Sequence, residues 1–247
     1  MLRIIKKIFN IFLEILYPYR CPSCKKIVHT NYVFCLDCWK KLRFIKKPIC
    51  NICGDIFQFS INNIALCGKC LKEKPIYDKA LSCFVYNKTI SKAIFEFKFY
   101  QKTFLSKFFA KFIIINIKEI IDDIDYIVPI PMNIKRLRWR GFNQSLLLVK
   151  SVAKLINKPF ISNLIIKTKH TKAQAKLKNK ERKVNLNSVF KINKRYLELV
   201  KNKNILIVDD VITTGTTVNK CSKVLKEAGV NKVYITSIAK TSLLRKN

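Results

Sequence analysis

The sequence predicts an α/β protein, a parallel sheet flanked by helices, with a small cysteine-rich metal module at its N-terminus. Over residues 75–247, apolar segments of strand length alternate with longer segments of helical period, a pattern typical of parallel sheets. Eight of the 10 cysteines lie instead within residues 1–74. A chain of 247 residues, 49% of them apolar, is long enough for one such domain and an appendage. We therefore expect a domain boundary between residues 74 and 75.

Residues 1–19 predict an amphipathic helix, because Arg3, Lys7, Asn10 and Glu14 fall on one helical face. Asn10 and Glu14 interrupt the apolar segment, and no small-residue cleavage site follows it, so a secretory leader is not indicated. The helix either packs on the protein or contacts a membrane surface. The chain has no apolar run of about 18 residues, so no transmembrane helix is expected. We expect a cytoplasmic protein.

Four Cys-x-x-Cys pairs dominate the N-terminal module. In the reducing cytoplasm, paired cysteines indicate metal ligands rather than disulfides, and two such pairs complete a tetrahedral zinc site. Sequential pairing is favoured over an interleaved arrangement, and iron–sulfur ligation is the alternative to zinc. A redox dithiol is disfavoured, because that role needs one pair. The expected ligands are Cys21, Cys24, Cys35 and Cys38 in one site, and Cys50, Cys53, Cys67 and Cys70 in the other.

Aromatic residues accompany these pairs, at Tyr32, Phe34, Trp39, Phe57 and Phe59. Exposed aromatic rings beside lysines would form a stacking platform for single-stranded nucleic acid. A small metal module otherwise lacks a core, however, so we favour the interpretation that these rings pack inside it.

The rest of the chain divides into strands and helices in alternation. Cys83 and Cys221 fall in apolar patterns and are expected in the core, whereas residues 167–183 are polar and basic without an apolar period. Ligands of parallel sheets gather beyond the carboxyl ends of the strands. The expected strands are 80–86, 125–131, 184–192, 204–208 and 233–239, and the expected helices are 88–100, 104–121, 141–156 and 215–228.

Residues 204–217 carry the strongest chemical signal. An apolar run ends in Asp209 and Asp210, and the loop Thr213–Thr217 follows at the start of a helix. Gly215 permits a positive φ, and hydroxyls with backbone N–H groups at a helix N-terminus bind phosphate. The carboxylates suit the vicinal hydroxyls of a sugar or a hydrated Mg²⁺. Together these features fit a ribose 5-phosphate. The alternative is an acidic strand end followed by an ordinary helix cap.

Three of the nine arginines, Arg136, Arg138 and Arg140, lie within five residues. Elsewhere the chain uses mainly lysine for positive charge, so the cluster indicates a need for the planar guanidinium, which binds phosphate through two hydrogen bonds. Gly141–Gln144 then opens a helix. A solvated basic loop is the alternative interpretation.

The formal net charge is +34, with 49 Lys and Arg against 15 Asp and Glu. Such an excess favours polyanionic partners, either nucleic acid, nucleotides or an anionic membrane face. Codon bias toward lysine, isoleucine and asparagine offers a second explanation, and the composition does not decide between them.

The segment Ile207–Thr217 resembles the signature of type I phosphoribosyltransferases, which bind phosphoribosyl pyrophosphate (PRPP) with Mg²⁺. By this resemblance Asp209 and Asp210 contact the ribose hydroxyls. The 5-phosphate is cradled by Thr213, Thr214, Gly215, Thr216 and Thr217.

Further segments resemble the ComF/GntX branch of that superfamily, namely Val128–Pro131, Arg138–Gln144 and Gln174–Leu177, with Arg182 and Asn185. The cysteine module ahead of the domain also fits. The resemblance implies a role in natural transformation, on incoming single-stranded DNA in the cytoplasm, where competence machinery proteins are possible partners. It further implies a pyrophosphate-facing loop over Pro129–Met132, with Pro131 and Met132 at the ligand, a phosphate contact from Lys98, and a mobile lid over residues 167–183. Gln144 and Arg182 are expected, like the three clustered arginines, to bind phosphate or DNA. Phe99 stands where the family usually has tyrosine.

Three hypotheses follow. The chain is a phosphoribosyltransferase with an unidentified acceptor, a single-stranded-DNA-binding protein that keeps the PRPP pocket as a sensor, or a transcriptional regulator that reads PRPP. No helix-turn-helix pattern supports the third hypothesis. We favour a zinc-stabilised PRPP-binding domain that works on or near single-stranded DNA. His29 and His170 are the only histidines, and His170 in the expected lid is a candidate general acid or base.

Overall fold

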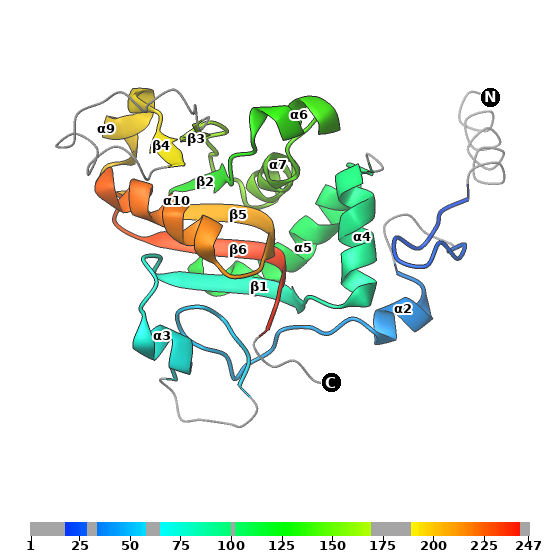
Figure 1. The fold of residues 1–247 in the computed structure, drawn as a ribbon. Helices are drawn as coiled ribbons and strands as arrows, with labels where there is room; N and C mark the ends of the chain where they lie inside the picture. Colours follow the sequence, from blue (N-terminus) through cyan, green and yellow to red (C-terminus); the bar gives the residue numbers. More distant parts are fainter. Residues whose placement is uncertain (1–17, 29–33, 58–64, 100–101, 169–188, 243–247) are drawn as a thin grey trace, which may run out of the picture.

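The computed structural model describes residues 18–28, 34–57, 65–99, 102–168 and 189–242. At its centre lies a parallel four-stranded sheet with the order β1-β6-β5-β2 (Figure 1). Ile205–Val208 in the middle of the sheet are fully buried, which is why this strand reads as a continuous apolar run. The strands are β1 Lys79–Val85, β2 Tyr126–Pro129, β5 Ile205–Ile212 and β6 Val233–Lys240.

Two hydrophobic cores lie on the two faces of this sheet. Leu206 and Val208 belong to one core, with α4, α5 and α7, whereas Ile205 and Ile207 belong to the other, with α10. This division follows from the alternation of side chains along a strand. The expected helices flanking a parallel sheet are therefore confirmed. Their bounds are α4 Lys88–Phe99, α5 Leu105–Ile117, α7 Gln144–Ile156 and α10 Thr216–Glu227, with short helices η1 Lys118–Ile120, η3 Lys194–Tyr196 and α9 Leu197–Val200.

The acidic pair lies inside a strand rather than after one, which corrects the expected strand 204–208. β5 continues to Ile212, because β6 offers partners along its whole length and Asp209 pairs in register with Ser237. The expected strand 184–192 is also corrected. Only Phe190–Ile192 (β4) is extended among its described residues, and it pairs antiparallel with β3, Ile165–Lys167, in a separate sheet.

A helix that the sequence pattern did not predict, α6, spans Ile134–Arg140. Asn133 caps it by accepting a hydrogen bond from the backbone N–H of Lys135 at 2.9 Å, and Gly141 ends it with φ 80°. None of its residues is buried, so it has no apolar period by which to be recognised. The expected helix 141–156 correspondingly begins later, at Gln144.

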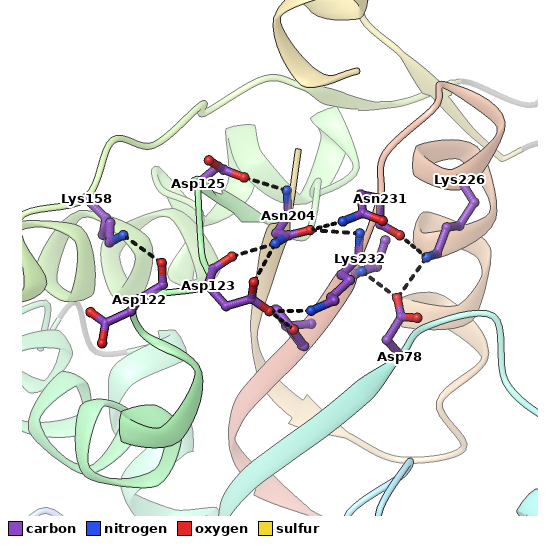
Figure 2. Close-up of polar contacts among 11 residues, drawn as sticks. Asp78, Asp122, Asp123, Asp125, Lys158, Asn204, Lys226, Asn231 and Lys232 are labelled. Atoms are coloured by element: carbon purple, nitrogen blue, oxygen red, sulfur yellow. Dashed lines mark hydrogen bonds and ion pairs between the residues drawn. The ribbon is translucent and has the colours of Figure 1, made fainter. Parts of the chain in front are cut away.

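Polar side chains join the amino ends of the strands (Figure 2). Asn204, before β5, donates from Nδ2 to Oδ1 of Asp123 at 2.8 Å, and its backbone N–H donates to Asp125 at 2.8 Å. The hydroxyl of Tyr234 and the ammonium of Lys232 also donate to Asp123. These donors, Tyr234 first, lower the pKa of the Asp123 carboxyl below its usual value. The network ties together the amino ends of the strands, at the opposite end of the sheet from the acidic pair.

The cysteine module contains two short helices, α2 Leu36–Lys40 and α3 Gly68–Lys72. Phe34 is buried and its ring lies 5.7 Å from that of Phe108 in α5. Trp39 remains 42% exposed, with its ring edge-on to Phe44 at 5.6 Å. The module therefore packs its rings against the domain as well as within itself.

Several expectations concern residues outside the described ranges. They include most of the N-terminal helix and most of the lid 167–183, together with Tyr32, Phe59, His29, His170, Arg182 and Asn185. Within the described ranges, no helix has the length and apolar character needed to span a bilayer.

Candidate functional site

The acidic pair lies toward the carboxyl end of β5, where two helices supply its neighbours. Asp210 is 9% exposed, and its Oδ1 lies 2.8 Å from the ammonium of Lys98 in the last turn of α4. Asp209 accepts hydrogen bonds through Oδ1 from the hydroxyl of Ser145 at 3.1 Å and from the backbone N–H of Asp210 at 2.8 Å. Ser145 lies in the first turn of α7, whose N-terminus therefore faces the pair. The structure thus brings three separate segments of the chain to one point.

Burial, and then the negative charge of Asp210, raise the pKa of Asp209 from its ordinary 3.8 to about 7. Lys98, and the hydrogen bonds from Asp210 and Ser145, act in the opposite direction. Asp210 is paired with Lys98, whereas the contacts of Asp209 are hydrogen bonds from neutral donors. Such a site favours a further cation or hydroxyl donors, and both are offered by a sugar with its Mg²⁺.

The loop after β5 is open. Gly215 adopts φ 80°, and nothing lies within 4 Å of the position a Cβ would occupy there. The threonine hydroxyls of Thr213, Thr214, Thr216 and Thr217 belong to exposed residues. Thr214 and Thr216 share a hydrogen bond between their hydroxyls at 2.9 Å. This geometry leaves the threonines exposed at the N-terminus of α10, the kind of place where a phosphate binds.

The expected pyrophosphate-facing loop follows β2. The N–H of Ile130 donates to the carbonyl of Val208 at 3.1 Å, so this loop starts beside the end of β5. Asn143 donates from Nδ2 to the carbonyl of Ile130 at 3.1 Å and ties the loop to the start of α7. Pro131 and Met132 are partly exposed beyond this point.

The three clustered arginines do not act as one unit. Arg140 donates to Oε1 of Gln144 at 2.6 Å, and its guanidinium lies 4.8 Å above the ring of Phe99. Burial lowers the pKa of Arg140, and the negative charge of Asp210 partly opposes this change. Arg136 and Arg138 are exposed on α6. Only Arg140 is therefore placed near the acidic pair.

Gln144 is fully buried, and its side chain has internal partners. It accepts from Arg140, and its Nε2 donates to the carbonyl of Lys98 at 3.4 Å. Gln144 thus links the ends of α4 and α6, close to the acidic pair. Ser145 was missed by the sequence reasoning, and its position after a capping asparagine at a helix start was the available signal.

The eight paired cysteines form two clusters in which every sulfur lies within 4.8 Å of the others. The sulfurs of Cys24 and Cys35 are 3.5 Å apart, as are those of Cys53 and Cys67. Tetrahedral thiolates at the usual zinc–sulfur distance lie about 3.8 Å apart, so both clusters fit zinc. The clusters are sequential, as expected, and not interleaved. Their members are Cys21, Cys24, Cys35 and Cys38, and Cys50, Cys53, Cys67 and Cys70.

The thiols of each cluster differ in acidity. Burial opposes ionisation of Cys21 and Cys50, yet backbone N–H groups that donate to their sulfurs lower the pKa of each to about 7. Burial raises the pKa of Cys38 to about 12 and that of Cys53 to about 11. Within each cluster, the four thiols can therefore all be ionised only when a cation lies among them, as a structural zinc ion does.

Comparisons with known proteins identify two domains. A double zinc ribbon domain matches residues 12–71, and a phosphoribosyl transferase domain matches residues 143–244. The first match agrees with zinc, rather than an iron–sulfur cluster, in the cysteine module.

Similar proteins align over most of the chain. Competence protein F of Haemophilus influenzae is 29% identical over 234 residues, 91% of this chain and 98% of that protein. DNA utilization protein YhgH of Escherichia coli (strain K12) is 27% identical over 231 residues, 91% and 98% of the two chains. Competence protein ComFC of Bacillus subtilis is 26% identical over 202 residues, 79% of this chain and 78% of that protein.

Proposed function

We propose that this chain binds PRPP with Mg²⁺ and serves DNA uptake in the cytoplasm. The premise is that the chain is a homologue of competence proteins F and ComFC, in which a double zinc ribbon is joined to a phosphoribosyltransferase domain. Residues 1–74 form the zinc module in this proposal, and residues 75–247 form the phosphoribosyltransferase domain. The module stabilises the fold, and the domain carries the chemistry.

The observation that carries the proposal is the placement of a partly neutralised acidic pair beside an open phosphate-type loop. Asp210 has one cation, Lys98, at 2.8 Å, whereas Asp209 has a pKa near 7 and two hydrogen-bond donors. A ribose brings two hydroxyl donors to such a pair, and its 5-phosphate then reaches the N-terminus of α10. An ordinary helix cap needs no such acidic pair.

Each element has a role in this proposal. Thr213–Thr217 bind the 5-phosphate through hydroxyls and backbone N–H groups, and Asp209 and Asp210 hold the ribose hydroxyls. Lys98 and Arg140 offset the charge of the pyrophosphate as it departs from C1 of the ribose. A bound Mg²⁺ would supply further charge compensation at the pyrophosphate, held by the ligand together with the acidic pair.

Other segments complete the site around the pyrophosphate. The backbone of the loop at Pro131 and Met132 faces the pyrophosphate, and the exposed Arg136 and Arg138 extend the positive surface outward. Arg182 would contribute from the lid, which excludes water while the bond to pyrophosphate breaks. The acceptor then attacks C1, where an oxocarbenium-like centre has formed. Gln144 acts through Arg140, which it positions.

A second candidate function is PRPP binding without turnover. It is favoured by the ion pair of Lys98 with Asp210, since a lysine that holds an acidic residue is less free to move with a leaving group. In this version the protein reads the PRPP concentration and couples it to DNA binding.

The DNA partner is supported by the named relatives and by charge. Two relatives are called competence proteins and one a DNA utilization protein, and this chain carries a net charge of +34. Incoming DNA is the polyanion that both facts accommodate. Proteins of the competence machinery are further possible partners.

Calorimetric titration of the zinc-loaded protein with PRPP and Mg²⁺ tests the proposal. We expect saturable binding that the variant Asp209→Asn/Asp210→Asn loses by about 100-fold. Asp122→Asn is a matched control, because Asp122 is an exposed aspartate at the opposite edge of the sheet, and it should bind like the unmodified protein. Absence of binding by the unmodified protein would refute the proposal.

Release of pyrophosphate separates the two candidate functions. Incubation of PRPP with single-stranded DNA, nucleobases or amines should release pyrophosphate if the protein is a transferase. Tight PRPP binding without release under all these conditions would leave the binding function alone.

A further inference from the structure

Three aromatic side chains form a continuous exposed surface between the cysteine module and the acidic pair. The ring centroids of Phe95 and Phe99 lie 4.5 Å apart, and those of Phe99 and Trp139 lie 5.7 Å apart. All three are exposed, and Trp139, at 72%, is the most exposed of them. We call these three residues the aromatic track. It joins the last turn of α4 to α6 through the contact of Phe99 with Trp139.

Burying apolar rings is the usual outcome of folding, so a row of exposed rings indicates a ligand or partner. Cations mark the kind of ligand. Lys88 and Lys92 lie 11 and 7 residues before Phe99 on α4, spacings that place them on the same helical stripe as the track. Both lysines are exposed. Along this stripe two ammonium groups are followed by three rings, so a single strand can place phosphates on the lysines and stack its bases on the rings.

The two ends of the track also carry positive charge. At one end Arg140 stacks on Phe99 at 4.8 Å, and the exposed Arg136 and Arg138 lie on the same short helix as Trp139. At the other end Phe95 and Lys92 line an open cavity of about 600 Å³, whose far wall is formed by Ser23, Cys24 and Lys25 of the first cysteine cluster. The track therefore connects this cavity to the surroundings of the acidic pair.

We propose that the aromatic track, with Lys88, Lys92 and the exposed arginines of α6, is the binding surface for single-stranded DNA, which passes from the cavity beside the first cysteine cluster to the phosphoribosyltransferase site. The inference deepens the proposed function, because it names the surface that the DNA partner uses. Bases stack on Phe95 and Trp139, and phosphates contact the cations between and beside them.

The end of this surface meets the acidic pair through two neighbouring residues. Lys98 precedes Phe99 and contacts Asp210 at 2.8 Å, and Arg140 follows Trp139 and stacks on Phe99. A strand on the track therefore lies within reach of the residues that hold PRPP. Binding of one ligand should influence binding of the other at this junction.

Tryptophan fluorescence tests the contact directly, because the chain has only two tryptophans. In a Trp39→Phe variant, Trp139 is the sole tryptophan. We expect an oligothymidylate of about 20 nucleotides to quench it as bases stack. The reciprocal variant Trp139→Phe keeps only Trp39, whose fluorescence should not change. Binding without quenching of Trp139, or quenching of Trp39 alone, would overturn the proposal.

Affinity measurements by fluorescence anisotropy complete the test. Trp139→Leu and Phe95→Leu should each weaken oligothymidylate binding about tenfold. Phe160→Leu, which removes an aromatic ring 40% exposed on another part of the surface, should leave the affinity unchanged. Lys88→Gln/Lys92→Gln should instead reduce the salt slope by about 0.7 for each lysine removed.

Two outcomes would refute the track as a base-stacking surface. Equal affinity for a blunt duplex, with both affinities unchanged in Trp139→Leu, would show a surface that recognises charge alone. A change of oligomeric state in Trp139→Leu, without a change in DNA affinity, would assign the track to a protein partner.

The variants separate this inference from the proposed function. Trp139→Leu should retain PRPP binding, and Asp209→Asn/Asp210→Asn should retain oligothymidylate binding when PRPP is absent. If Asp209→Asn/Asp210→Asn loses PRPP binding and Trp139→Leu does not, the PRPP pocket is supported even if the aromatic track does not bind DNA. If Trp139→Leu loses oligothymidylate binding and Asp209→Asn/Asp210→Asn does not, the aromatic track is supported even if the pocket does not bind PRPP.

Discussion

The first cysteine cluster packs on the helices α4 and α5, whereas the second is joined to the strands and the loop around the acidic pair. In the second cluster, Lys240 at the end of β6 donates to the carbonyl of Cys53 at 2.6 Å. Lys69 of α3 donates to the carbonyl of Thr214 in the phosphate loop at 3.0 Å. The neighbouring N–H of Ile76 donates to Asn219 of α10 at 2.7 Å.

The first cluster makes different connections. Asn87 donates from Nδ2 to the carbonyl of Lys41 at 2.8 Å, and Lys25 forms an ion pair with Glu96 of α4. Neither of these contacts reaches the phosphate loop. The comparison shows that two centres of the same chemistry, in one small module, can support different neighbours on the two faces of a sheet.

The largest effect should come from removing one ligand of each centre. Cys67→Ser and Cys35→Ser are matched, because each cysteine is partly exposed and lies at the N-cap of the short helix in its cluster. Both variants should hold one zinc per chain instead of two. Cys67→Ser should weaken PRPP binding by about tenfold or more, since the phosphate loop loses its support.

Cys35→Ser should bind PRPP as before and lose oligothymidylate affinity instead. Metal analysis and calorimetry check both variants. An equal loss of PRPP affinity in the two variants would break the distinction between the centres.

A second test uses two glycines with positive φ. A Cβ on Gly54, which has φ 67°, would lie 2.3 Å from the carbonyl oxygen of Ala80 on β1, whereas Gly141, with φ 80°, has open space. Gly54→Ala should reduce the free energy of unfolding by about 3 kcal/mol, because the second cluster must move off the sheet. Gly141→Ala should cost about 1 kcal/mol, from backbone strain alone. Thermal or urea unfolding measures the difference, and equal losses would contradict the close packing.

A third test uses pH. Asp209 has a pKa of about 7, and the ionised carboxylate accepts the ribose hydroxyls. PRPP affinity should therefore fall as the pH drops below about 7, by up to tenfold per pH unit. Stability should change in the opposite sense: the folded state holds the Asp209 proton more tightly than the unfolded state, so this group lowers the free energy of unfolding as the pH rises from about 4 to 7.

Oligothymidylate binding is the control for this pH dependence. It depends on lysines and arginines that stay charged in this range, and so it should not change. Calorimetry at about pH 6 and pH 8 checks both ligands, and a PRPP affinity independent of pH would contradict the assignment of Asp209.

The smallest effect should follow removal of one exposed lysine in each cluster. Lys69→Gln removes the hydrogen bond to Thr214 and should weaken PRPP binding about threefold, because exposed contacts contribute little. Lys26→Gln removes an exposed ion pair with Asp37 in the first cluster and should have no effect on PRPP. Titration of both variants gives the comparison, and a larger loss for Lys26→Gln would refute it.

Much of the fold was predictable because it depends on patterns that one segment carries alone. The apolar run 205–208 predicted a strand that leads to the phosphate loop, and the Cys-x-x-Cys spacing predicted two sequential clusters; both were confirmed. The resemblance to the ComF/GntX family was confirmed by the competence proteins and by the two domains. The positive φ of Gly215 was also expected from the loop sequence.

The rest depends on contacts between distant segments. β5 extends past Asp209 because it pairs with β6, and the sequence around Asp209 carries no information about that partner strand. The exposed helix α6 has no apolar face, and the contacts of Lys98 with Asp210 and of Ser145 with Asp209 join residues far apart in the chain. Roles of the site residues, which no comparison decides, stay predictions until the titrations are made.

The acidic residues at the amino edge of the sheet have a consequence for the rate of encounter. Asp78, Asp122, Asp123 and Asp125 gather there among lysines (Figure 2), and they are four of only 15 acidic residues in the chain. That edge is therefore closer to electrical balance than the edge with α6 and the end of α4. A long polyanion approaching by diffusion will be turned toward the unbalanced edge before any contact forms. The positions of the few carboxylates thus set the orientation in which the polyanion first meets the protein.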